Sequence, residues 1–181
     1  MTEPDDTEFV RRTLAGDREA FGSLVGRYQK PLFNLAYGIL DDADEAEEIA
    51  QAAFVKAFEN LSSYDPSRKF FSWLYRIALN EALTSANRRR RFSRIEADVA
   101  DDSGGGSTEE RTEDEEMLRA AVTALKPDHR AVVVLKHLQG LSYTEISQVL
   151  NTPEKTVKSR LFSARLALRR VLEQKGFTFH G

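Results

Sequence analysis

Residues 141–172 read LSYTEISQVLNTPEKTVKSRLFSARLALRRVL, and this stretch decides the fold of the C-terminal half. Ser142 and Glu145 have the spacing of a capping box, which marks the start of a helix. After a short turn, Thr152 is expected to cap a second helix, with Pro153 at the first helical position, where a missing N–H costs nothing. The stretch therefore predicts a helix-turn-helix.

The second helix of this pair combines a buried stripe with a cationic outer face. Val157, Leu161, Ala164 and Leu168 recur at spacings of three and four residues, which predicts burial. The opposite face can reach phosphates and base edges in a DNA major groove, and it carries Lys155, Lys158, Ser159, Phe162 and Arg165. A solvated helical hairpin whose cations only confer solubility is the alternative.

Two further helices are expected before this motif, over residues 117–125 and 128–138, with Lys126-Pro127 between them. The charge distribution supports DNA binding by this half. Residues 117–181 carry a net charge of +7, whereas residues 1–94 carry −1 and residues 95–116 carry −9. Such a division indicates two domains, at least one of which meets a polyanion.

The acidic segment is the expected boundary between the domains. Residues 98–116 read DVADDSGGGSTEERTEDEE, which has no large apolar side chain after Val99. This composition cannot bury enough surface to offset the entropy of ordering, so it predicts a flexible linker.

The N-terminal half also reads as helical throughout. Helices are expected over residues 7–15 and from Asp17 onward, with an interruption at Pro31. Next comes an acidic-start helix, over residues 41–61, and then an aromatic and basic helix, over residues 72–91. No strand is required, so the fold class is all-α: two small helical domains joined by a flexible acidic linker.

The aromatic and basic helix ends in four consecutive arginines, residues 88–91. Cations stabilise the C-terminus of a helix, but four exceed that need and indicate phosphate contact. Strand separation requires aromatic surfaces that hold an unstacked base beside cations that follow the backbone. Phe70, Phe71, Trp73 and Tyr75 beside Arg76 supply that combination, although the spacing of Trp73 favours a place in the core.

The composition excludes several classes of protein. The 181 residues contain no cysteine and three scattered histidines, so we expect no disulfide, no metal and no cofactor. No paired carboxylates with a nearby histidine support a hydrolase, and we expect no enzymatic activity. No apolar run could span a membrane and the N-terminus is polar, which predicts a cytoplasmic protein without membrane insertion.

Four motifs in order resemble the extracytoplasmic-function (ECF) sigma factors of the sigma-70 superfamily. They are AFGSLVGRYQKPLFNLAYGIL at 20–40, EAEEIAQAAF at 45–54, FFSWLYRIALNEAL at 70–83 and TVKSRLFSARLALRR at 156–170. The resemblance spans residues 7–172. It implies region 2 over residues 7–94, a linker over residues 95–116 and region 4 over residues 117–175.

The resemblance also implies partners and site residues. Region 2 would bind the largest-subunit clamp of bacterial core RNA polymerase through Glu45, Glu47, Glu48, Ile49, Gln51 and Phe54. It would open the −10 promoter element with the loop 60–71 as a base pocket and with Tyr64, Phe70, Trp73, Tyr75, Arg76, Asn80, Thr84, Arg88, Arg89, Arg90 and Arg91. Region 4 would read the −35 element with Lys155, Lys158, Ser159, Phe162 and Ser163. Arg160 and Arg165 are candidates for phosphate contact or helix packing.

Two positions depart from the family pattern: Ala52 replaces a usual glutamate, and Thr84 replaces a frequent aspartate. Family members are often held by an anti-sigma factor, so one is expected here. In the family the linker threads the polymerase active-site cleft, where its ten carboxylates would imitate phosphates; a plain tether is the alternative. An ordinary helix-turn-helix regulator that is not a polymerase subunit is the alternative for the whole chain.

Overall fold

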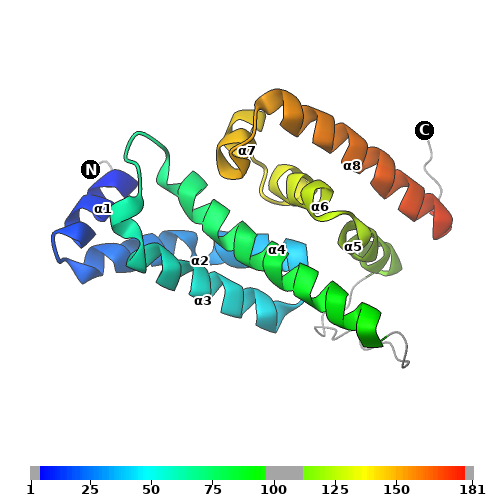
Figure 1. The fold of residues 1–181 in the computed structure, drawn as a ribbon, viewed down its shortest axis with the longest axis horizontal. Helices are drawn as coiled ribbons and strands as arrows, with labels where there is room; N and C mark the ends of the chain where they lie inside the picture. Colours follow the sequence, from blue (N-terminus) through cyan, green and yellow to red (C-terminus); the bar gives the residue numbers. More distant parts are fainter. Residues whose placement is uncertain (1–4, 97–111, 178–181) are drawn as a thin grey trace.

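The structure is a computed structural model that describes residues 5–96 and 112–177, and every regular element in these ranges is helical (Figure 1). The expected all-α fold is confirmed. The N-terminal half contains α1 (Asp6–Leu14), α2 (Arg18–Leu40), α3 (Ala43–Glu59), the 3-10 turn η1 (Leu61–Ser63) and α4 (Phe70–Glu96). The C-terminal half contains α5 (Glu113–Ala124), α6 (Pro127–Val133), the π-helical turn η2 (Val134–Leu138), α7 (Tyr143–Leu150) and α8 (Glu154–Gln174).

Side-chain caps fix the starts of several helices, as the sequence predicts. The Asp17 carboxylate accepts hydrogen bonds from the backbone N–H groups of Glu19 and Ala20, at 3.1 and 3.2 Å. Ser142 and Glu145 form the predicted capping box, in which each side chain accepts from the other residue's backbone N–H, at 3.2 and 2.9 Å. These bonds satisfy N–H groups that have no partner within a helix.

The prediction that Pro31 interrupts the second helix is wrong. α2 runs without a break from Arg18 to Leu40. Proline removes one hydrogen bond of the helix ladder, but Leu32 and Leu35 beside it are fully buried, and α2 packs against both α3 and α4. Tertiary packing outweighs the local penalty of the proline.

The predicted C-terminal boundary of the flexible linker, residue 116, is wrong. α5 begins at Glu113, inside the acidic segment, and Thr112 with Glu115 forms a capping box there. Four acidic residues occupy the first turn of α5, where the positive end of the helix dipole favours them. Residues 97–111 of the predicted linker lie outside the described residues.

Two smaller boundaries in the C-terminal half also differ from the expectation. Thr152 does not cap α8, because its hydroxyl donates to the Leu150 carbonyl at 3.1 Å. Pro153 is the residue before the helix, and its carbonyl accepts the first helical bonds from Thr156 and Val157. The helix expected over residues 128–138 is α-helical only to Val133 and ends in η2.

The hydrophobic core does not respect the division into halves. One continuous cluster joins the buried residues of α2, α3 and α4 to six from the C-terminal half: Ala131, Val134, Leu135, Ile146, Val149 and Val157. A second cluster lies within the C-terminal half and contains Leu125, Val132, Val133, Leu161 and Ala164. We call the contact of α2 and α4 with α6, η2 and α7 the seam (Figure 1).

Gly38 of α2 lets η2 approach closely at the seam. A Cβ atom added at Gly38 would lie 2.8 Å from Leu138 Cδ1 and 3.0 Å from Val134 Cγ1. Carbon atoms do not approach so closely, so a larger residue at Gly38 would require the exposed Leu138 side chain to rotate and the buried Val134 to shift by a few tenths of an ångström. In the ranges 5–96 and 112–177, no helix is long and apolar enough to cross a membrane.

Candidate functional site

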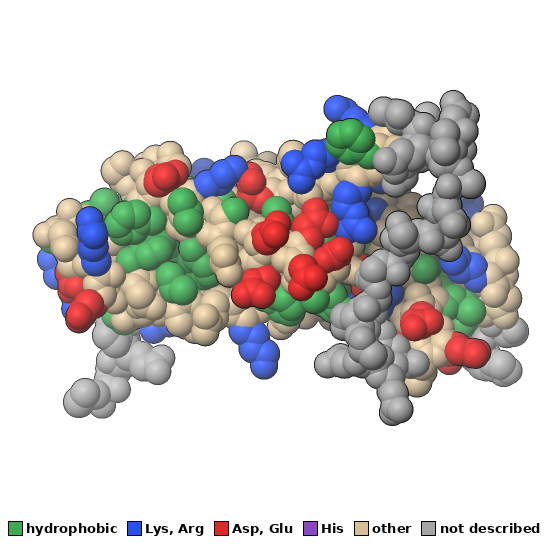
Figure 2. All heavy atoms as spheres, turned by 90° about the horizontal axis from the view of Figure 1, so that it is seen from below, with side chains coloured by type: hydrophobic (Ala, Val, Ile, Leu, Met, Phe, Trp, Pro, Cys, Tyr) green, Lys and Arg blue, Asp and Glu red, His purple; other side chains and the backbone are tan. Residues whose placement is uncertain are grey.

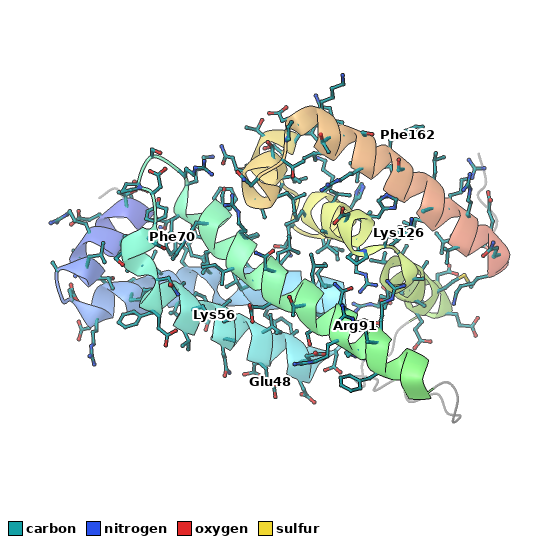
Figure 3. All side chains as sticks on the ribbon, in the orientation of Figure 1. Glu48, Lys56, Phe70, Arg91, Lys126 and Phe162 are labelled. Carbon is teal, nitrogen blue, oxygen red and sulfur yellow. The ribbon has the colours of Figure 1, made fainter. Side chains whose placement is uncertain are left out.

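The exposed face of α3 changes from acidic to apolar along the helix. Glu47, Glu48 and Gln51 are exposed near its start, and Val55 and Phe58 are 57% and 43% exposed near its end. Figure 2 shows acidic and hydrophobic side chains side by side on the face of the molecule that includes α3, and Glu48 points outward from it in Figure 3. This stripe could receive a partner with both basic and apolar side chains.

Three of the predicted polymerase-binding residues on α3 are less exposed to solvent. Glu45 accepts hydrogen bonds from Ser85 and from Arg89, the latter at 2.9 Å, so it ties α3 to α4. Phe54 is 9% exposed and meets Phe21 edge to face, with ring centroids 6.5 Å apart. Ile49 is half-buried and packs against the core.

Val55 and Phe58 are surface residues that the sequence reasoning missed. Phe58 continues the apolar repeat of α3, which predicts burial, yet its ring lies at the edge of the core, 5.0 Å from the Phe21 ring. The exposure of Phe58 could have been expected from the width of the apolar stripe, because the stripe is wider than one face of α3 can bury.

The predicted base-pocket aromatics pack against one another. The ring centroids of Tyr64, Phe70 and Trp73 are 5.4 to 5.7 Å apart. Tyr64 and Phe70 are buried, Trp73 is half-buried, and the Tyr64 hydroxyl donates to the Arg68 carbonyl. The loop before α4 is therefore held by a compact aromatic cluster, of which Trp73 offers the most surface.

The next turn of α4 faces the C-terminal half. Arg76 donates to the carbonyls of Val149 and Gln148, at 3.0 and 2.5 Å, and Ser72 donates to the Gln148 side chain at 3.2 Å. Tyr75 donates to the Gln139 side chain at 3.3 Å.

Burial raises the pKa of Tyr75 to about 12 and lowers that of Arg76. Two of the predicted −10 residues therefore belong to the seam.

The rest of α4 is more open. Asn80 and Thr84 are exposed. Of the four arginines at residues 88–91, Arg88 donates to Ser85 at 3.2 Å and Arg89 pairs with Glu45. Arg90 and Arg91 are exposed, and neither forms an ion pair with a residue of the described ranges. Within the part of the chain that the structure describes, Arg90 and Arg91 thus add positive charge that no carboxylate pairs.

The outer face of α8 is open, as the sequence predicts. Phe162 is 65% exposed, and the other exposed candidates are Lys155, Lys158, Ser159, Ser163 and Arg165. Figure 3 shows Phe162 on the edge of α8 that faces away from α4. Of the predicted stripe on the opposite face, Val157, Leu161 and Ala164 are buried and Leu168 is half-buried.

Contacts at the base of α8 orient several of its cations. Arg160 pairs with Asp128 at 3.5 Å, which favours the packing role over the phosphate role for this residue. Lys158 lies over the Tyr143 ring, 5.3 Å from its centroid. Arg165 approaches His137 Nε2 at 3.3 Å, and burial together with Arg165 and Lys136 lowers the pKa of His137.

Comparison with known proteins identifies the two halves. The sigma-70 region 2 model matches residues 24–92, and the sigma-70 region 4 model matches residues 115–168. The chain is 35% identical over 176 residues to the ECF RNA polymerase sigma factor SigW of Bacillus subtilis, covering 90% of this chain and 94% of the relative. It is 34% identical over 176 residues to the ECF RNA polymerase sigma-E factor of Escherichia coli, covering 90% and 92%. The chain belongs to the ECF sigma factors.

A solved structure shares the arrangement of this ECF sigma factor. CnrH, solved in complex with the cytosolic domain of CnrY, is 27% identical and aligns with a TM-score of 0.72 over 93% of this chain and 97% of its own. The region 2 match contains every predicted polymerase and −10 residue, and the region 4 match contains every predicted −35 residue. The roles of the individual residues stay predictions.

Proposed function

We propose that this ECF sigma factor directs core RNA polymerase to its promoters through three separate faces. The stripe on α3 binds the clamp of the largest subunit, α4 with its preceding loop engages the −10 element, and α8 reads the −35 element. The protein contributes specificity and strand opening rather than a catalytic group, and it acts in the cytoplasm with the polymerase.

The exposed face of α8 is the observation that carries this proposal. A helix fits the major groove, and lysine, serine and arginine side chains supply donors for phosphates and base edges. Phe162 is 65% exposed, and it lies among these polar side chains on the same face of the helix. Contact with a thymine methyl group would bury it.

The seam gives the proposal a conformational step. Arg76 and Tyr75 cannot reach DNA while they bond to Gln148, Val149 and Gln139. We therefore infer that region 4 separates from region 2 before the −10 element is opened. An anti-sigma factor would hold the packed form; CnrH, of which 97% aligns with this chain, was solved in complex with the cytosolic domain of CnrY.

In vitro transcription with bacterial core polymerase tests the proposal. A library of genomic fragments from the source organism is transcribed with and without the protein, and transcripts should begin at a defined set of sites only when it is present. The control is Lys158→Ala with Ser159→Ala, which should alter the −35 bases in the recovered promoters. If the protein binds duplex specifically by itself and adds no initiation, it is an ordinary regulator.

A further inference from the structure

A cavity of about 390 Å³ opens at the seam between the end of α2, the end of α4 and the α5–α6 connection. Its walls are of two kinds. Aliphatic side chains form one part, with Ile39, Leu40, Ala86 and Ala124. Three arginines form the other part: Arg89 and Arg90 from α4 and Arg130 from α6.

Arg130 is a buried charge that no carboxylate of residues 5–96 or 112–177 neutralises. Its side chain is 3% exposed, and it donates to the carbonyls of Ile39, Leu125 and Thr123, all of which are neutral. Its Nε–H has no hydrogen-bond partner among the residues that the structure describes. No carboxylate of the described ranges pairs with it. A buried charge without a counter-charge is costly even when carbonyls accept some of its hydrogen bonds, so an anion in the cavity would be stabilised here.

The neighbouring arginines add to the positive charge around the cavity. Arg89 is neutralised by Glu45 at 2.9 Å, but Arg90 has no carboxylate partner within residues 5–96 or 112–177. Burial and the proximity of Arg90 and Arg89 lower the pKa of Arg130 to about 10. The same positive field that disfavours the guanidinium would attract phosphate groups.

We propose that this cavity binds a nucleotide, with the phosphates at Arg90 and above Arg130 and the base or ribose on the aliphatic wall. The volume lies in the range of sites for small ligands, and the combination of apolar and cationic walls suits a molecule with both kinds of surface. A free inorganic anion would leave the aliphatic wall uncovered.

Such a ligand would also stabilise the packed form. The cavity takes Arg89 and Arg90 from region 2 and Arg130 with Thr123 from region 4, so it exists only while the seam is closed. A molecule that binds one of two states shifts the equilibrium toward that state. The nucleotide would thereby disfavour opening of the seam.

Thermal unfolding and equilibrium dialysis of the full-length protein test the proposal, with ATP, tripolyphosphate and adenosine as probes at about 0.15 M salt. ATP should raise the unfolding midpoint by roughly 5 °C or more at concentrations far above its Kd. Tripolyphosphate should bind about tenfold more weakly or worse, and adenosine should not bind measurably.

Arg90→Gln should weaken ATP binding about tenfold, and Arg90→Glu should abolish it. Arg18→Gln and Arg18→Glu are the matched controls, because Arg18 is an exposed arginine at the start of α2, away from the cavity. Circular dichroism checks that all four variants keep their helices. The proposal is overturned if Arg90→Glu binds ATP as the unmodified protein does, if the Arg18 variants lose binding equally, or if tripolyphosphate binds as tightly as ATP.

Discussion

Arg76 shows how one residue can serve two states of the protein. Its guanidinium satisfies two carbonyls at the end of α7, a position where a helix has carbonyls without partners. In the proposed open state the same group would be free for DNA phosphates. The sequence places Arg76 correctly beside aromatic residues, but it cannot show that the arginine has a partner within the chain.

Glu48 offers a direct test of the proposed polymerase surface. Glu48→Arg should weaken binding to core polymerase about tenfold or more, because a carboxylate that meets basic side chains would be replaced by a like charge. Pulldown or fluorescence anisotropy with labelled protein measures this. Glu19→Arg, a charge reversal at an exposed position in the first turn of α2, is the matched control. Equal loss in both variants would contradict the assignment.

His137 predicts a pH dependence of stability. Its pKa is lowered from the ordinary value of 6.5 in the folded protein, by burial and by the charges of Arg165 and Lys136. The unfolded chain therefore takes up the proton first, so the contribution of His137 to stability is complete above pH 6.5 and is lost as the pH falls through the lower, folded pKa.

Urea unfolding of the unmodified protein and of His137→Gln, each at pH 7.5 and pH 5.5, measures this contribution. The unmodified protein should lose more unfolding free energy over this interval than the variant. The comparison removes the effect of other acidic and basic groups, because both proteins share them. Equal losses would mean that His137 titrates alike in the folded and unfolded states.

At the scale of elements, α8 separates stability from recognition on its two faces. Leu161 is 2% exposed, and Leu161→Ala should cost about 2–5 kcal/mol of unfolding free energy through the cavity it leaves. Phe162→Ala should change unfolding by less than about 0.5 kcal/mol, because the ring is exposed. The same change should weaken binding to −35 duplex within holoenzyme.

Urea unfolding and promoter filter binding make this pair of measurements. A large loss of stability in Phe162→Ala would show that the ring packs against the protein. Unchanged promoter binding in that variant would remove Phe162 from the reading face.

Helix α7 shows what the spacing of apolar residues can and cannot predict. The spacing of Ile146, Val149 and Leu150 in α7 favours an inward face; Ile146 and Val149 are fully buried, and Leu150 is half-buried. Their partners were not predictable, because a repeat of apolar residues identifies the inward face of a helix but not the surface against which it packs. Ile146 and Val149 join the cluster that contains α4. Local caps predicted the starts of α2 and α7 but not that of α8, and Pro31 misled because its cost is small beside the packing of α2.

At the scale of the whole molecule, the seam makes two domains behave as one packed body. Ionic contacts at its edges, such as Arg119 with Asp41 at 2.8 Å, add to the shared core. Such exposed pairs contribute less than about 1 kcal/mol each, whereas full burial of Ile146 or Val149 contributes about 1.5–3 kcal/mol. The apolar part of the seam therefore decides whether it stays closed.

A reversible crosslink tests whether the seam must open. The chain has no cysteine, so Ser72→Cys with Gln148→Cys supplies a unique thiol pair at side chains that are 3.2 Å apart in the closed form. Joined by a short disulfide-containing crosslinker, this variant should lose nearly all promoter opening with core polymerase, and reduction should restore it. Permanganate footprinting of the −10 element measures opening. Full opening by the crosslinked protein would show that the closed seam is compatible with function.

The bonds that cross the seam have a consequence for how such proteins diversify. Arg76 and Arg130 end on main-chain carbonyls, at Gln148, Val149 and Ile39, and a carbonyl is present whatever side chain the position carries. The exposed side chains of the C-terminal half can thus change while these hydrogen bonds across the seam are kept. We expect chimaeras in which the exposed face of α8 comes from another protein to keep the closed seam and to gain the new DNA specificity.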